Sequence, residues 1–142
     1  MKKLAFVTPW FGENIPGGAE MELRGLVRHL HDAGVELEIL STCVENFNSD
    51  WSQNFHREGI SDFNGIVVRR FLADPRYTDA FNSVNLKLMN NLPITPEEED
   101  IYLNEMVNSD RLCTFIRTHY EEYGLFIFIP YMFGTTYFGS VR

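Results

Sequence analysis

Apolar runs alternate with segments of helical period along the 142-residue chain. Residues 4–8 (LAFVT) form an apolar run that is typical of a strand covered on both faces. A helical period follows from residue 19 and predicts an amphipathic helix that Gly34 ends. Its apolar side consists of Met21, Leu23, Leu26, Val27, Leu30 and Ala33. Residues 35–42 then predict a second strand, so the first part of the chain is a βαβ unit.

Two further strands are predicted, at residues 65–71 and 125–130. The run LFIFIP at residues 125–130 is the most hydrophobic in the chain, which favours a central place in the sheet. Residues 46–64 are polar and aromatic without a clear period, and we expect an irregular excursion there.

Helices are predicted between these last two strands. Residues 81–89 have a helical pattern, and Thr95, followed by Pro96 and a run of acids, indicates a helix start. Ser109 is a second cap candidate, for a helix over residues 110–123. The expected fold class is therefore α/β, a Rossmann-like three-layer domain with a mostly parallel sheet.

Composition narrows the possible functions. Twelve Lys and Arg against 20 Asp and Glu give a formal net charge of −8, which argues against nucleic-acid binding. The chain lacks a signal-peptide core and a run of about 20 apolar residues, so no transmembrane segment and a cytoplasmic location are expected. Cys43 and Cys113 match no metal spacing and are expected to be reduced, structural thiols.

Gly17 and Gly18 lie where the first strand hands over to the helix. Glycines there allow a close backbone approach to a ligand, and the helix N-terminus favours an anion, so one interpretation is a phosphate or pyrophosphate seat. The other interpretation is that they only permit a sharp turn. The Walker loop and the G-x-G-x-x-G fingerprint are both absent from this segment.

The segment VTPWFGENIPGGAEMELRGLVRHLHDAGVELEILST (residues 7–42) resembles the N-terminal start of retaining glycosyltransferases of the GT-B fold, family 4 (group 1). Residues 127–139 (IFIPYMFGTTYFG) look like the family's later strand and the loop after it. The resemblance implies that residues 1–142 are the N-terminal, acceptor-side domain of a two-domain enzyme. The chain stops where a helix is predicted to open near Thr135, so we expect a truncated chain that lacks the C-terminal nucleotide-sugar domain.

The resemblance also implies a reaction, transfer of a sugar from a nucleotide-sugar donor to a glycan, lipid or small-molecule acceptor. Gly17 and Gly18 are then expected to approach the donor diphosphate from across the cleft. The nucleotide-sugar is a substrate, and neither a cofactor nor a protein-bound metal is implied. The fragment alone is expected to be inactive, with its own missing domain as a partner. For the full-length protein, a peripheral membrane location stays open.

Candidates for the acceptor side are Trp10, Phe11, Tyr131 and Thr135. The rings of Trp10 and Phe11 either stack on a sugar or wall off the cleft. Tyr131 either offers a hydroxyl or packs under its loop. Many relatives carry a histidine near the reacting sugar, whereas Pro130 and Tyr131 stand in that neighbourhood here, so no catalytic residue is assigned.

The aromatic residues of the excursion either recognise an acceptor or pack over the core. They are Phe47, Trp51, Phe55 and Phe63. Lys87, Arg69 and Arg70 either steer an anionic acceptor or, for the arginines at the strand end, pair with neighbours. Two other functions stay open for the whole chain. One is a non-catalytic α/β module that binds a phosphorylated ligand, and the other is a scaffold whose exposed face pairs with a partner.

Overall fold

The computed structural model describes residues 2–129 and 133–140. These residues form one five-stranded sheet with the order β3-β4-β2-β1-β5. Its strands are β1 (Lys3–Val7), β2 (Leu37–Thr42), β3 (Gly59–Phe63), β4 (Ile66–Phe71) and β5 (Tyr123–Phe128). The helices are α1 (Gly18–Asp32), α2 (Thr78–Met89), α3 (Pro96–Asn104), α4 (Asp110–His119), the 3-10 turn η1 (Tyr120–Glu122) and α5 (Gly134–Ser140).

The sheet is mixed. β1 pairs in parallel with β2 and with β5, and β2 pairs in parallel with β4. β3 is antiparallel to β4. The predicted α/β class is confirmed, and the arrangement is compatible with a Rossmann-like domain.

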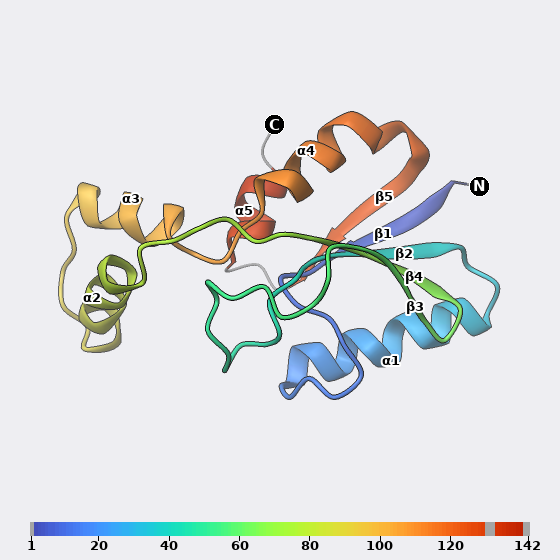
Figure 1. Ribbon diagram of the computed structural model, residues 1–142, viewed down its shortest axis with the longest axis horizontal. Coiled ribbons are helices and arrows are strands. Elements are labelled where there is room, and N and C mark those ends of the chain that lie inside the picture. The colour runs from blue at the N-terminus through green and yellow to red at the C-terminus, as the bar shows by residue number, and fades with distance from the viewer. Residues whose placement is uncertain (1, 130–132, 141–142) are drawn as a thin grey trace.

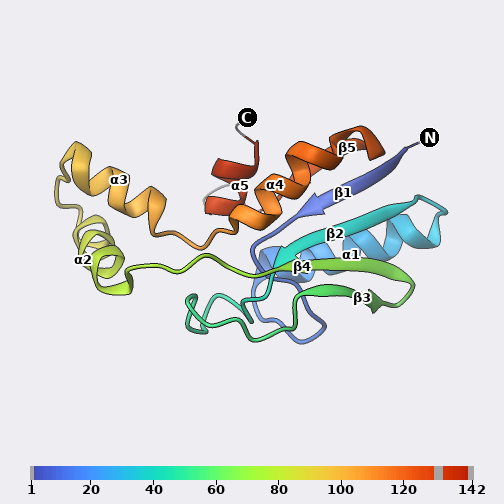
Figure 2. The same cartoon turned by 45° about the horizontal axis from the view of Figure 1, so that its top comes forward.

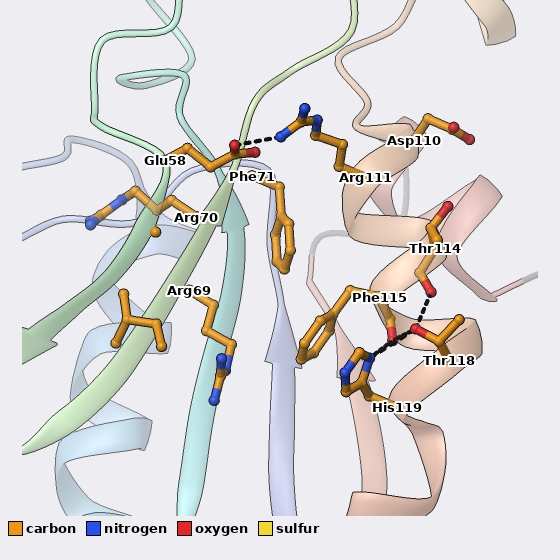
Figure 3. Close-up of a pocket in the computed structure, with 12 residues that line it drawn as sticks. Glu58, Arg69, Arg70, Phe71, Asp110, Arg111, Thr114, Phe115, Thr118 and His119 are labelled. Carbon is orange, nitrogen blue, oxygen red and sulfur yellow. Dashed lines mark hydrogen bonds and ion pairs between the residues drawn. The ribbon is translucent and has the colours of Figure 1, made fainter.

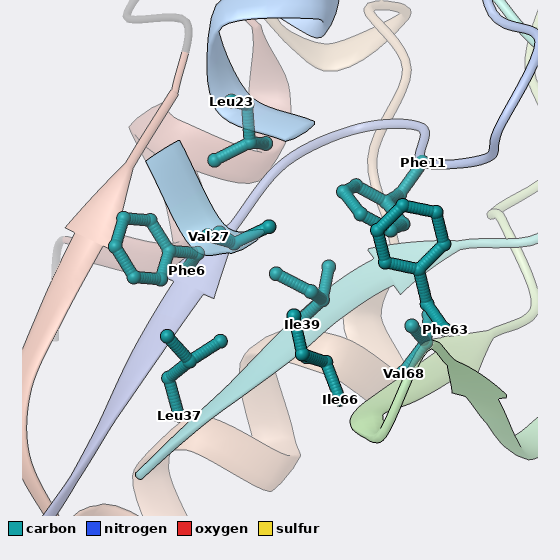
Figure 4. Close-up of a cluster of buried hydrophobic side chains, with 9 residues drawn as sticks. All are labelled: Phe6, Phe11, Leu23, Val27, Leu37, Ile39, Phe63, Ile66 and Val68. Carbon is teal, nitrogen blue, oxygen red and sulfur yellow. The ribbon is translucent and has the colours of Figure 1, made fainter. Parts of the chain in front are cut away.

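Helices lie on both faces of the sheet. α1 lies along one face, while α4 and α5 lie on the other (Figure 1). Buried apolar side chains from α1, from the strands and from the loop after β1 fill the space between α1 and the sheet (Figure 4). They are Phe6, Phe11, Leu23, Val27, Leu37, Ile39, Phe63, Ile66 and Val68. The apolar side of α1 is narrower than its sequence predicts, because Met21 and Leu26 are exposed.

A polar network interrupts the apolar packing on the α4 face. Glu38 on β2 is buried and accepts hydrogen bonds from Lys3 Nζ at 2.5 Å, Arg69 Nε at 2.7 Å and the Tyr123 hydroxyl at 2.8 Å. These donors stand on β1, β4 and β5, so one carboxylate joins four strands.

The α2–α3 hairpin extends from the sheet at the end where the parallel strands finish (Figures 1 and 2). Within the hairpin, the ring of Phe81 on α2 stacks on Tyr102 of α3 at 5.1 Å. The same ring contacts Trp51 of the body at 5.6 Å. Thr95 and Ser109 cap α3 and α4 as their sequences predict, and Thr95 forms a full capping box with Glu98.

Three predictions about the elements need correction. Residues 59–63 of the expected excursion form β3, which pairs with β4 through a turn at Asn64 and Gly65. The fourth helix ends at His119, not at 123, because residues 120–122 form the 3-10 turn η1 and β5 begins at Tyr123. β5 is an edge strand of the described sheet and not a central one, and Leu125 is exposed there.

Both cysteines are free and buried, which confirms the expected reduced thiols. Burial raises the pKa of the Cys113 thiol to about 11. Of the helices that the structure describes, none combines the length and the apolar character that crossing a bilayer requires.

Candidate functional site at the carboxyl edge of the sheet

The loop between β1 and α1, residues 8–17, is held in place by side chains from other elements. Thr42 Oγ1 donates to the carbonyl oxygen of Pro9 at 2.6 Å, and Arg70 Nη2 donates to that of Phe11 at 2.7 Å. Arg24 of α1 donates to the carbonyl oxygens of Gly12 and Ile15 at 3.2 and 2.9 Å. A loop with its carbonyls tied in this way presents a preorganised backbone to whatever approaches it.

Gly17 and Gly18 form the start of α1 at this edge. Gly17 is the residue before the first turn, with φ 120° and ψ 148°, a conformation that requires glycine. It provides no side chain to cap the helix, so the first-turn amides need another partner. Both glycines are exposed, and a Cβ atom added at Gly18 would meet nothing within 4 Å.

The carboxylate of Glu20 lies beside Gly17. A Cβ atom at Gly17 would fall 2.2 Å from Glu20 Oε2, while Glu20 Oε1 accepts a hydrogen bond from Trp10 Nε1 at 2.8 Å. A carboxylate at a helix N-terminus is electrostatically favourable. The chain therefore places one negative charge of its own next to the predicted anion seat.

Aromatic rings from three loops meet at the same edge. Trp10 contacts Phe133 at 4.9 Å, Trp51 at 5.8 Å and Phe47 at 6.0 Å between ring centroids. Trp10 and Phe11 are only 1% and 2% exposed, so their rings form the wall beneath the loop and not a surface for stacking. The ring faces nearest to solvent belong to Phe47 and Trp51.

A hollow of about 350 Å³ lies beside this aromatic cluster. Its lining combines rings with amide, carboxylate and guanidinium groups, from Phe47, Asp50, Trp51, Arg76, Phe81, Asn82 and Asn85 among others. Arg76 lies over the rings of Trp51 and Phe81 at 5.1 and 4.8 Å. Its buried Nη2 has no hydrogen-bond partner among the described residues. Burial lowers the pKa of Arg76.

The other predicted acceptor-side residues are not brought to this hollow. Thr135 is completely buried at the start of α5, and its Oγ1 atom has no partner among the residues that the structure describes. Tyr131 lies outside the described residues. Sequence reasoning missed Arg76, Asn82 and Asn85; two asparagines three residues apart on α2 were the available signal, but their approach to Trp51 depends on the tertiary fold.

A larger hollow of about 520 Å³ separates the β3–β4 hairpin from α4 (Figure 3). Phe71 and Phe115 line it, and two of the cations in its lining are already paired. Arg69 pairs with Glu38 at 2.7 Å, and Arg111 pairs with Glu58 at 2.5 Å. We therefore place the candidate functional site at the glycine loop and the Trp51 hollow.

Within residues 2–129 and 133–140, no three His, Cys, Asp or Glu side chains are grouped so as to hold a metal ion. The fold and the edge loops define an α/β domain with an exposed, glycine-bearing first crossover. Comparison of the chain with protein-family models, with curated proteins and with solved structures finds no match.

Proposed function

We propose that the chain is the N-terminal, acceptor-side domain of a retaining glycosyltransferase that uses a nucleotide-sugar donor. Gly17 and Gly18 are the proposed contact to the donor diphosphate, and the partner is a second domain of the same protein that binds the nucleotide. By itself the 142-residue chain is expected to bind ligands weakly and to turn over nothing.

The observation that carries the proposal is the position of the glycine loop in the sheet. β1 lies between β2 and β5. The chain therefore adds β2, β3 and β4 on one side of β1 and then adds β5 on the other side. In open α/β sheets this reversal of strand order opens a crevice at the carboxyl ends of the strands, where ligands bind. Gly17 and Gly18 start α1 at this point, with exposed backbone.

The Trp51 hollow supports the acceptor side of the proposal. A sugar presents apolar C–H faces and a rim of hydroxyls, which suit an aromatic ring flanked by amide and charged groups. Phe47 and Trp51 provide rings, and Asn82, Asn85 and Asp50 provide the polar rim. This hollow replaces Trp10 and Phe11 as the proposed place of the acceptor.

The anion seat is tested by titrating the ¹⁵N-labelled chain with inorganic pyrophosphate. The readout is the backbone amide resonances of residues 17–20. We expect saturable shifts, because the first-turn amides are the donors. Gly18→Val projects a branched side chain into space that is open in the free protein, and should weaken pyrophosphate binding about tenfold, or about 1.4 kcal/mol.

Gly25→Val is the matched control. Gly25 is on the same helix, is exposed, and likewise has nothing within 4 Å of an added Cβ. Gly17→Ala is unsuitable, since it would collide with the Glu20 carboxylate whether or not a ligand binds. Equal affinities of the Gly18 and Gly25 variants would leave only the sharp-turn interpretation. Nucleotide diphosphates, UDP and GDP, then test whether binding extends beyond the phosphates.

A further inference from the structure

Arg70 stands on the α1 face of β4, opposite in direction to Arg69 and Phe71. The alternation of side chains along a strand places it with Val68 and Ile66, which pack under α1. Figure 3 shows its guanidinium directed away from Phe115 and Arg111. Nη1 donates to Ser61 Oγ at 2.8 Å and Nη2 to the carbonyl oxygen of Phe11 at 2.7 Å.

This arginine is a half-buried cation without a counterion. Its neighbours Arg69 and Arg111 pair with Glu38 and Glu58, but across the part of the chain that the structure describes Arg70 makes no ion pair. Its Nε atom is buried and has no acceptor within residues 2–129 and 133–140. Burial accordingly lowers the pKa of the Arg70 guanidinium. A charge removed from water without a partner is costly, in a chain that carries eight excess negative charges.

Two more orphaned polar atoms lie around Arg70. Among the described residues, His56 Nε2 is buried without a partner. Burial and the charge of Arg70 both lower the pKa of His56, which favours the neutral imidazole. Ser41 is the register partner of Arg70 on β2, hence on the same face of the sheet. Its Oγ is also buried without a partner in the described part of the chain. Buried polar atoms normally have partners, so three neighbouring exceptions indicate something unaccounted for.

Arg70 and His56 line one hollow of about 460 Å³, which also reaches Gly12 of the β1–α1 loop and Ser61. Two carboxylates are present, those of Glu13 and Asp62. Asp62 Oδ2 accepts from the amide of Gly65 at 3.2 Å and belongs to the β3–β4 turn, while Glu13 is exposed. Neither makes an ion pair with Arg70, and the space exceeds the roughly 30 Å³ share of one water many times.

We propose that this hollow is a binding site for a small oxyanion, a carboxylate or a phosphate ester, held by Arg70 with His56 beside it. An oxygen of the ligand would accept from Arg70 Nε and, in the appropriate tautomer, from His56 Nε2. The site is separate from the glycine seat at the start of α1, so it stands whether or not the chain transfers sugars.

The test is a titration of the ¹⁵N-labelled chain with inorganic phosphate and, separately, with acetate, at constant ionic strength set by chloride. The readouts are the Arg70 Nε–H and His56 ring resonances. We expect saturable shifts with at least one oxyanion; phosphate alone would indicate a phosphate ester, and acetate alone a carboxylate. The absence of saturable shifts with both, as for a hollow that holds only water, would overturn the proposal.

Variants distinguish a specific oxyanion site from nonspecific attraction by positive charge. Arg70→Lys keeps the charge but removes the guanidinium fork, and should weaken oxyanion binding at least tenfold. Arg111→Lys makes the same change at an exposed position and should leave binding unchanged. Equal losses in the two would contradict the proposal. Arg70 also donates hydrogen bonds to Ser61 and to the Phe11 carbonyl, so Arg70→Lys can unfold the chain. In that case His56→Gln, for which we expect a severalfold loss of oxyanion affinity, tests the site together with the wild-type titration. Gly18→Val should not alter these shifts, which separates this site from the glycine seat.

Discussion

Single side chains determine how strongly the start of α1 attracts an anion. Glu20 serves the helix as a first-turn acid and also accepts the indole N–H of the buried Trp10. An incoming diphosphate would meet that carboxylate at Gly17. The helix N-terminus attracts an anion, and the Glu20 charge opposes it, so the net affinity depends on which effect is larger.

Glu20→Gln should therefore raise the affinity for pyrophosphate about fivefold, which corresponds to about 1 kcal/mol. The amide oxygen of glutamine still accepts from Trp10 Nε1, so the loop is preserved while the charge is removed. Isothermal titration of the variant and of Glu22→Gln, an exposed neighbour on the same turn, measures the effect. Identical gains in both variants would mean that only the net charge of the chain matters.

Elements whose determinants are local follow from the sequence. The caps at Thr95 and Ser109 are present because a capping hydroxyl bonds an amide only three residues away. β3 is different, since its residues GISDF are mostly exposed and become a strand only through pairing with β4. One local signal was available in the sequence, because an Asn-Gly pair between two strands favours a hairpin. In the structure Asn64 and Gly65 have the positive φ angles of such a turn, 51° and 89°.

Thr95→Ala should destabilise α3 alone. Loss of the capping box costs about 1 kcal/mol, so amide hydrogen exchange over residues 98–104 is expected to accelerate about fivefold. The sheet amides should not change, because the α2–α3 hairpin projects from the body (Figure 2). Thr118→Ala, at an exposed site within α4, is the control. Equal acceleration throughout the sheet would show that the hairpin and the body unfold together.

On the scale of the whole molecule, the Glu38 network ties the sheet together. Burial alone would raise the pKa of Glu38, but the hydrogen bonds from Arg69, Lys3 and Tyr123 outweigh burial and hold that pKa below its ordinary value. A carboxylate with a lowered pKa stabilises the fold above its unfolded pKa. That contribution disappears as the pH falls through the lower, folded value.

Acid should therefore weaken the protein partly through this one group. Guanidinium unfolding of the wild type should lose stability below about pH 4.5, the region where a carboxyl titrates in the unfolded chain. Glu38→Gln should cost about 2 kcal/mol at pH 7 and make the decline toward pH 3 shallower. If the two stability curves run parallel between pH 6 and pH 3, the pKa of Glu38 is not lowered by folding.

The sequence by itself determined the α/β class, most element positions, both predicted caps and the glycine-bearing turn at the start of α1. These depend on periodicity and on contacts between residues a few positions apart. Only the tertiary structure decided that Trp10 and Phe11 are buried, that β5 lies at an edge, and that Arg70 and His56 line one hollow. Such outcomes depend on which distant segments pack together and on what remains in water, and a linear pattern carries neither.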